Sequence, residues 1–446
     1  PSLEAWGQWP WPRSRLARLL DGIAGMGARS IALDFIMAET DRTSLKTLHE
    51  ELKRELALLE NAGDAPPMLP DNDVILAATL SGGPFVLGYE FHFEDNHRNN
   101  AGCHLYPLEL IDIQQPANGA ASLTLHQAQG AVCNIDRLAR AAPHSGFLNG
   151  RVDGDGRLRR LPLVIRYGQS VYPNLALAAL LPTVIGQPAK LKQRAGDQSR
   201  LTLGDHSIPI DHNGNLRIRF ADKQSTLRHI SADRVLTGQV DESEIKDRMV
   251  FVGLSASGLA SAYQTPADGL FSAVDVHAQA LETILSGSYI HRHSGIVLAE
   301  VILSIMVAFL YSLCIARLEF VTTTAIGAAG IVMLAGGAQM LFNSRQLLLS
   351  PLLRTTVIIS SGLVLMLFKY WTRQRKARRG LQDALILMRS SQNDLNAIIK
   401  TIPDIVFRLD ASGRITFISP ALAKYKKQPE ELVGKHILDI VSPEDR

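Results

Sequence analysis

Cysteine is scarce in this chain, which has 446 residues and three cysteines, Cys103, Cys133 and Cys314. No pair of them has C-x-x-C spacing, which argues against a zinc site and against thioredoxin-type chemistry. Cys314 lies within a long apolar run, where we expect it to pack against neighbouring side chains. Cys103 and Cys133 share the N-terminal segment, where an oxidising compartment would permit a disulfide. The sequence leaves their pairing open.

Motifs of known catalytic chemistry are also missing. The sequence has no nucleophile elbow, no H-E-x-x-H zinc motif and no phosphate-binding glycine loop. We therefore identify no catalytic residue and no metal site, and the sequence requires no cofactor. Aromatic residues make up 6% of the chain and do not alternate with basic residues in a patch, so we expect no nucleic-acid partner.

Apolar residues, in contrast, form three long runs. These are Ile296 to Ala316, Val321 to Phe342 and Leu347 to Phe368. Each is close to the roughly 20 residues that a helix needs to cross a bilayer, which predicts three membrane-spanning helices in contact with lipid. Glu300 and Arg354 lie near the outer ends of the first and third runs, where a pairing between them would lock two spans together.

Basic residues indicate how these spans are oriented. A cluster follows the third run directly and consists of Lys369, Arg373, Arg375, Lys376, Arg378 and Arg379. Basic residues near span ends stay on the cytoplasmic side. We therefore expect a multi-pass protein of the bacterial inner membrane, with residues 1–292 extracytoplasmic and residues 369–446 cytoplasmic. The chain begins without a Met or an apolar leader, so we expect its start to be a cut.

Residues 1–292 alternate helical and strand patterns. Leucines at helical spacing precede the short apolar run ARSIALDFI, and PFVLGYEF and MVFVGLSA are further candidate strands. VDVHAQALETIL before Gly287 predicts a helix with a glycine stop. Asp153 to Gly156 and Asn213-Gly214 are hairpin signals. This order predicts an α/β domain with a mainly parallel sheet and two hairpins.

Four polar residues of this domain are candidates for ligand binding. Asp34, Glu39 and Asp41 follow the first strand, and ligands commonly sit at the carboxyl ends of strands in open α/β sheets. The alternative is an acidic loop that forms turns and caps a helix. His277 lies on the apolar stripe of its helix, where we expect a core or pocket-wall histidine in preference to a metal ligand.

Several motifs of this segment stand in a familiar order. They are WGQWPWPRS, ALDFIMAETDR, VDGDGRLRRLPLVIRYGQSVYPNLALAAL, MVFVGLSASGLASAYQTP and VHAQALETILSGSYI. The segment resembles the extracytoplasmic sensor domain called CHASE type 2, which typically precedes three consecutive membrane spans. The resemblance implies an extracytoplasmic ligand but not its identity. The opening strand of the family and its preceding membrane helix are absent, and Ser272-Ala273 stands where a Pro-Gly is usual.

Residues 373–402 show a heptad pattern, whose apolar positions are Leu381, Leu385, Met388, Leu395 and Ile399. This seam predicts a signalling helix that forms a parallel homodimer. A single amphipathic helix on a domain surface is the alternative.

Residues 393–446 contain the strand candidates DIVFRLD and RITFIS around a turn. With EELVGK and a closing PEDR, they resemble the N-terminal half of a PAS domain, an α+β fold. The resemblance specifies no ligand or cofactor, and we expect His436 to be a surface residue.

These features together predict a bacterial transmembrane receptor. We expect an output domain beyond Arg446, by resemblance a two-component histidine kinase with a response regulator as partner. The alternatives are a receptor that makes or degrades cyclic di-GMP and a non-catalytic, membrane-anchored binding protein.

Overall fold

The computed structural model describes residues 2–57, 69–94, 102–112, 123–184, 186–192, 199–220, 227–256, 258–259, 261–267, 269–290, 294–345 and 351–441. The chain forms two compact units. The first comprises Pro1–Leu303 and Leu334–Pro351, and the second comprises Ser304–Met333 and Leu352–Arg446. Each unit is described by itself.

A parallel sheet forms the centre of the first unit. Its strand order is β14 (Met249–Gly253), β1 (Ser30–Asp34), β2 (Phe85–His92) and β6 (His144–Phe147), and every neighbouring pair is parallel. The far half of β2 also pairs with the antiparallel strand β5 (Gly130–Val132). The predicted mainly parallel α/β fold is confirmed.

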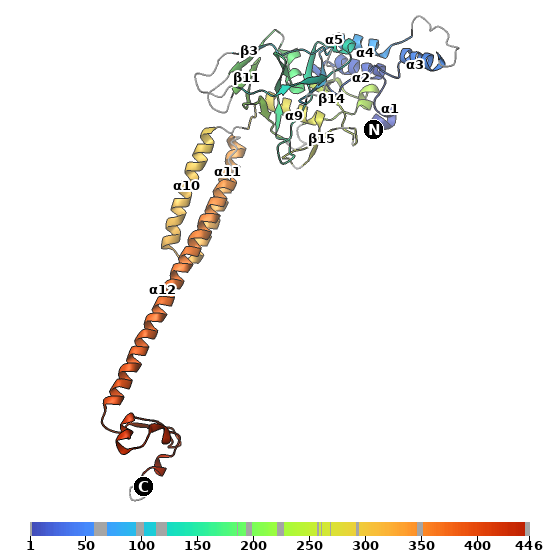
Figure 1. Ribbon diagram of the computed structural model, residues 1–446. Helices are drawn as coiled ribbons and strands as arrows, with labels where there is room; N and C mark the ends of the chain where they lie inside the picture. Colours follow the sequence, from blue (N-terminus) through green and yellow to red (C-terminus); the bar gives the residue numbers. More distant parts are fainter. Residues whose placement is uncertain are drawn as a thin grey trace. The chain divides into compact units, whose positions relative to one another are not determined.

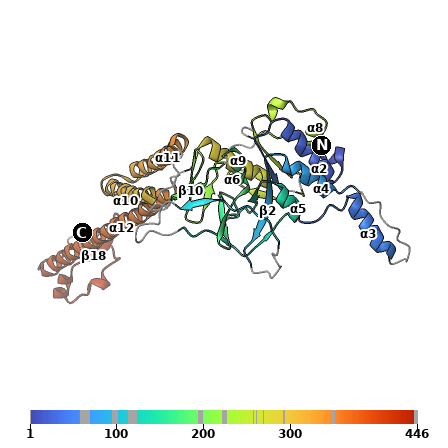
Figure 2. The same ribbon diagram turned by 90° about the horizontal axis from the view of Figure 1, so that it is seen from above.

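Helices cover both faces of this sheet (Figures 1 and 2). One face packs against α2 (Arg13–Gly25), α4 (Asn72–Ser81) and α5 (Asp136–Ala141), and the other against α6 (Leu175–Ala178) and α9 (Ala273–Ser286). Strand alternation explains the two layers, because successive side chains point to opposite faces. The first face buries Ile31, Leu33, Phe85 and Leu87, and the second buries Ala32 and Val86.

Helix α9 begins and ends at residues suited to those positions. Ser272 is its N-cap in a capping box with Asp275, and Ser272 Oγ lies 2.7 Å from Asp275 Oδ2. Gly287 ends the helix at φ 64°, a left-handed conformation that glycine adopts without steric cost. The predicted glycine stop is confirmed, and Ser272 serves as a cap at the point where the resembled family usually has Pro-Gly.

Smaller sheets complete the first unit. Their strands are β3 (Leu110–Asp112), β4 (Gln127–Ala128), β7 (Arg160–Pro162), β8 (Val164–Tyr167), β9 (Ser170–Pro173), β10 (Ala189–Lys192), β11 (Ser199–Leu203), β12 (His206–Ile210), β13 (Asn215–Arg217), β15 (Ala262–Gln264) and β16 (Leu270–Ser272). Further helices among the described residues are α1 (Ser2–Trp6), α3 (Leu45–Ala57), α8 (Ala232–Leu236), η1 (Leu181–Thr183) and η2 (Glu242–Glu244).

The two hairpin signals have different outcomes. At Asp153 to Gly156 the chain turns back, and an antiparallel bridge joins Arg151 to Arg160. At Asn213-Gly214 the tight turn forms with Gly214 at φ 81°, but β12 pairs with β11 and β13 pairs with β7. The second prediction identified the turn correctly and the strand partners wrongly.

Cys103 and Cys133 form a disulfide with a Cα–Cα distance of 5.8 Å. The bridge packs beside a small aromatic core on the antiparallel half of β2, formed by Tyr89, Phe91 and Phe147. It therefore ties the segment after Gly102 to strand β5.

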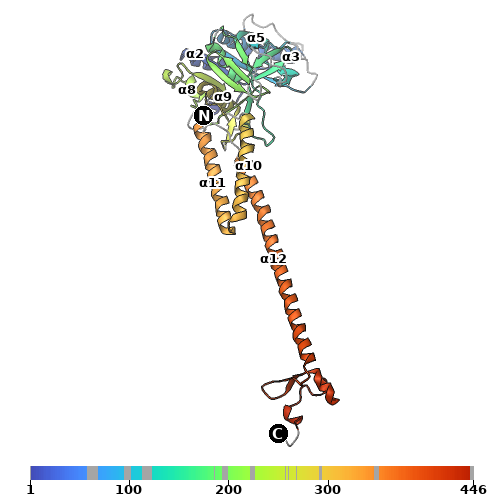
Figure 3. The same ribbon diagram turned by 90° about the vertical axis from the view of Figure 1, so that its left-hand side faces the viewer.

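Three long helices follow, α10 (Ser294–Arg317), α11 (Phe320–Arg345) and α12 (Pro351–Thr401). Each contains a segment long and apolar enough to cross a membrane. Helix α12 continues without a break from the third apolar segment through the heptad region, as Figure 3 shows. Conformational changes in the third span can therefore reach the heptad region through a continuous helix.

Within the second unit, side chains join these helices. A Cβ added to Gly327 of α11 would lie 2.6 Å from Tyr311 Oη of α10, and one added to Gly362 of α12 would lie 3.1 Å from the same ring. Small residues allow such close helix contacts in membranes. Lys369 Nζ donates to the carbonyl oxygens of Ile315, at 2.7 Å, and Leu318, at 2.8 Å. These contacts fasten α12 to the end of α10.

A small antiparallel pair follows α12. Strands β17 (Phe407–Leu409) and β18 (Ile415–Ile418) pair across a turn in which Gly413 has φ 77°. The predicted hairpin is confirmed. Three 3₁₀ turns, η3 (Pro420–Tyr425), η4 (Pro429–Glu431) and η5 (Ile437–Asp439), follow it. Ile415, Ile418, Leu422 and Leu432 form the buried core of this region.

Candidate functional site

Asp34 and His277 meet inside the first unit, although 243 positions separate them in the sequence. Asp34 is the last residue of β1, and His277 lies in the second turn of α9. His277 Nε2 is 3.7 Å from Asp34 Oδ1, and the two side chains are 2% and 4% exposed. The contact lies at the carboxyl end of the parallel sheet, the edge where α/β folds commonly place their sites.

Burial determines the protonation of this pair. Burial, and then the negative charge of Asp275, raises the pKa of Asp34 from 3.8 to about 7. Burial lowers the pKa of His277 from 6.5 to about 4, against an opposing hydrogen bond with the main chain of Leu148. Near neutral pH the imidazole is therefore uncharged and cannot neutralise Asp34. The pair is a proton-sensitive contact and not an ordinary ion pair.

Neighbouring polar groups hold the pair in place. His277 Nδ1 lies 3.2 Å from Asn174 Oδ1, and the Asn174 amide donates to the carbonyl oxygen of Phe147 at 3.1 Å. Asn174 also caps helix α6, since its Oδ1 accepts from the Ala176 N–H. On the other side, His229 Nε2 is 2.7 Å from Asp275 Oδ1. Strand β6 and helices α6 and α9 thus meet at this cluster.

Asp41 has a different role. Its carboxylate accepts hydrogen bonds from the Arg13 and Thr43 main-chain N–H groups, the Thr43 hydroxyl and the Asn72 amide, at 2.8 to 2.9 Å. Although burial opposes it, these bonds lower the pKa of Asp41. The Glu39 carboxylate is exposed and pairs with Arg42 at 2.8 Å. The geometry of both residues matches the alternative of an acidic turn-forming loop.

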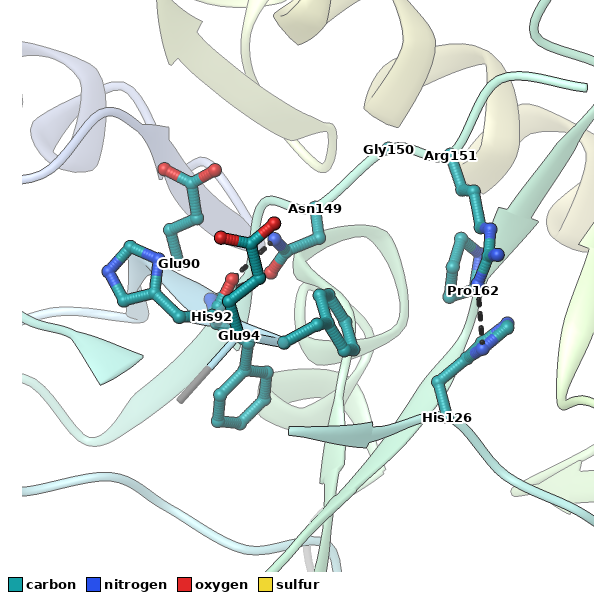
Figure 4. A pocket seen from close by; sticks show the side chains of 10 residues that line it. Glu90, His92, Glu94, His126, Asn149, Gly150, Arg151 and Pro162 are labelled. Atoms are coloured by element: carbon teal, nitrogen blue, oxygen red, sulfur yellow. Dashed lines mark hydrogen bonds between the residues drawn. The ribbon is translucent and has the colours of Figure 1, made fainter. Parts of the chain in front are cut away.

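A cavity of about 450 Å³ lies beside the far half of β2 (Figure 4). Its lining residues are Glu90, Phe91, His92, Phe93, Glu94, His126, Asn149, Gly150, Arg151 and Pro162. In Figure 4, the side chains of Glu90 and Glu94 lie on one side and those of Arg151 and His126 on the other. Sequence reasoning missed this cavity. The available signal was the alternation of aromatic and polar residues in YEFHFE, which predicts a strand with one polar face.

Tyr263 of β15 lies beside the wall of the cavity. Its ring lies against Gly150, where an added Cβ would be 3.0 Å from the phenol oxygen. Burial, and then the negative charges of Asp34 and Glu90, raises the pKa of Tyr263. Because both carboxylates act on one phenol, a change of charge at either end alters the electrostatic environment of the same side chain. Tyr263 and Asp275 are site residues that sequence reasoning did not identify.

The intramembrane and seam candidates belong to helices α10 and α12. Glu300 of α10 is 4% exposed, whereas the side chain of Arg354 lies outside the described residues, so their pairing stays a prediction. The seam residues Leu381, Leu385, Met388 and Leu395 are 64%, 57%, 74% and 57% exposed on α12, and Ile399 is half-buried. Their use as a dimer interface also stays a prediction.

An α/β domain, three helices long and apolar enough to cross a membrane and a small strand-containing module follow one another along the chain. The family model of the CHASE2 domain matches residues 1–316, so the chain belongs to the CHASE2 domain family, whose members are extracellular sensor domains. The PAS fold model matches residues 393–446. Both resemblances inferred from sequence motifs are thereby confirmed. Comparisons with curated proteins and with solved structures found no match.

Proposed function

We propose that this chain is the sensing and relaying part of a bacterial inner-membrane receptor. Its CHASE2 domain detects an extracytoplasmic signal, its three helices cross the membrane, and its PAS region passes the change to an output domain. The observation that carries the proposal is the order of the CHASE2 match, three apolar helices and the PAS match along one chain. Helix α12 adds physical support, since it extends as one helix from the third span towards the PAS region.

Sidedness has a direct test. We expect residues 1–292 outside and residues 369–446 inside, because the basic cluster follows the third span. Single cysteines introduced at the exposed positions Lys190 and Ser390 in a Cys314→Ser background would report it. A membrane-impermeant maleimide should label position 190 in intact cells, and position 390 only after permeabilisation. Labelling of position 390 in intact cells would refute the orientation.

We further propose that the output is a histidine kinase that phosphorylates a response regulator. The receptor that makes or degrades cyclic di-GMP is the second candidate, and both suit a PAS region after a signalling helix. Full-length receptor in nanodiscs should form an acid-labile phosphohistidine from ATP. Conversion of GTP to cyclic di-GMP, or hydrolysis of cyclic di-GMP, would favour the second candidate. If neither occurs, the protein is a non-catalytic binding protein.

The seam on α12 is the proposed homodimer interface. Its apolar side chains are largely exposed in one copy, and a parallel partner helix would cover them. Cysteines at Leu381, Met388 and Leu395 should form disulfide-linked dimers in membranes, in a chain without Cys314. Matched cysteines two positions further along, at Asp383, Ser390 and Ala397, face away from the seam and should cross-link weakly. Equal cross-linking of both sets would contradict a seam-mediated dimer.

A further inference from the structure

The cavity beside β2 has an acidic wall and a basic wall, and we propose that it binds a dibasic amino acid such as lysine. The inference rests on the proposed receptor function, since it names the class of ligand for the sensor domain. The carboxylate of the ligand would pair with Arg151, and its two amino groups with Glu90 and Glu94.

Strand geometry produces the acidic wall. Side chains alternate along β2, so Glu90 and His92 point away from the aromatic core that buries Tyr89 and Phe91, and Glu94 follows in the same alternation. The three polar side chains are exposed. Both carboxylates line the same cavity, where they are available to pair with the amino groups of a cationic ligand. Among the described residues no group of acidic, histidine and cysteine side chains could hold a metal ion, which favours an organic cation here.

The basic wall is built around Arg151. Its Nη1 lies 3.2 Å from His126 Nδ1, while His126 Nε2 lies 3.3 Å from Asn215 Oδ1. Burial, and then the charge of Arg151, lowers the pKa of His126, which keeps the ring neutral. The hydrogen-bond partners assign the ring proton to Nε2, so Nδ1 accepts from Arg151. His126 thereby orients a guanidinium whose remaining donors suit two-point pairing with a carboxylate.

The balance of charge selects the ligand class. Glu90 and Glu94 carry two negative charges and Arg151 one positive charge, so these three groups leave one negative charge in excess. A dibasic amino acid carries two ammonium or guanidinium groups and one carboxylate, and its net charge of one compensates that excess. The volume of about 450 Å³ falls in the range of small-molecule sites. Asn149 is held by two hydrogen bonds to the main chain of Phe91, at 2.8 and 3.0 Å, and gives the site a rigid base.

Binding to the whole chain in nanodiscs tests the proposal without any output measurement. Isothermal titration with L-lysine should detect binding. L-norleucine, which lacks the side-chain amine, and cadaverine, which lacks the carboxylate, should each bind at least about tenfold more weakly, the loss expected for one charge-assisted contact. Absence of L-lysine binding, or equal binding of L-lysine, L-norleucine and cadaverine, would overturn the assignment.

Variants locate the binding site. Arg151→Gln should weaken lysine binding at least about tenfold and leave cadaverine binding nearly unchanged, whereas Glu90→Gln should weaken the binding of both lysine and cadaverine. Exposed residues away from the cavity provide controls, and Glu109→Gln and Arg29→Gln should bind lysine as the wild type does. Binding that survives both cavity variants would place lysine elsewhere and refute the inference. Lysine binding to this cavity without a change in output would instead refute the receptor function.

Discussion

Replacing Asp34 by Asn should make the sensor domain more stable at alkaline pH. Asp34 is buried at the end of β1, next to an uncharged imidazole and near the carboxylate of Asp275. Its ionised form therefore lacks a compensating charge in this contact. Asn has nearly the same shape and never ionises, so the substitution removes the cost of the buried charge and preserves the volume of the side chain.

The sign and size of the effect follow from the pKa of Asp34. The folded state raises it from 3.8 to about 7, so the folded protein binds more protons than the unfolded chain between these values. Stability from this group is fully present below pH 3.8 and is lost as the pH rises towards 7. At roughly 1.4 kcal/mol per pKa unit, ionisation costs the folded state up to about 4 kcal/mol. The advantage of Asp34→Asn should therefore grow by up to this amount between pH 4 and pH 8.

Other titrating groups near Asp34 set the background of this experiment. The pKa of His277 is lowered to about 4, so its contribution has the opposite slope, with stability lost as the pH falls from 6.5 towards 4. Tyr263 stays neutral across the range, because burial and then the nearby carboxylates raise its pKa. Both groups are present in the wild type and in the variant, so the difference between the two proteins isolates Asp34. Repeating the comparison in His229→Gln tests the imidazole that contacts Asp275.

Hydrogen exchange on the whole chain in nanodiscs provides the assay. Peptides that cover β1 and α9 report local opening, and comparing variant with wild type at equal pH cancels the intrinsic exchange rate. Asp41→Asn is the matched control. Burial opposes ionisation of Asp41, but its hydrogen bonds lower its pKa. This variant should therefore lose protection at neutral pH and approach the wild type in acid. A difference between Asp34→Asn and wild type that stays constant from pH 4 to pH 8 would refute the reasoning.

Two further predictions concern the membrane block and the disulfide between Cys103 and Cys133. Gly327→Leu should separate helices α10 and α11 and lower the melting temperature in detergent, because its Cβ would fall 2.6 Å from the Tyr311 hydroxyl. Gly330→Leu is the control and should leave the melting temperature unchanged, because the space around its Cβ is open. Cys133→Ser opens a bridge between residues 30 positions apart, a loop whose closure stabilises by about 3–4 kcal/mol in the chain-entropy estimate. A reductant should destabilise the wild type and leave this variant unchanged; equal sensitivity of both proteins would contradict the prediction.

The sequence predicted the elements of the domain better than the contacts between them. The apolar run that became β1 and the periodic segment that became α9 were both recognisable, and Asp34 and His277 were each named as candidates. Their contact depends on how α9 docks on the sheet and on the registers of β1 with β14 and β2. These are contacts between segments that are far apart in the sequence. Local sequence patterns do not predict such contacts, so the sequence identified the two residues as candidates but did not predict that they lie next to each other.

The acidic loop is a second case in which sequence patterns did not predict the contacts of a residue. Asp34 and Asp41 are seven positions apart, and the sequence grouped them into one candidate site. Asp41 instead accepts hydrogen bonds from the start of α2 and from Asn72 of α4. The cavity beside β2 was missed for a related reason. Its acidic wall follows from strand alternation, but Arg151 and His126 reach it from other segments.

Helix α9 precedes the first apolar helix, α10, in the chain. It carries Asp275 and His277 in its first turns, and the chain passes from its Gly287 cap to the start of the first membrane helix at Ser294. We expect a movement of α9 to shift the start of this helix along the chain, and Lys369 joins the far end of the helix to α12. A ligand beside Glu90 would act on this route only if it binds two positions of α9 with different affinity. Burial, and then the charges of Asp34 and Glu90, raise the pKa of Tyr263, so neutralising Glu90 alters the electrostatic environment of this phenol.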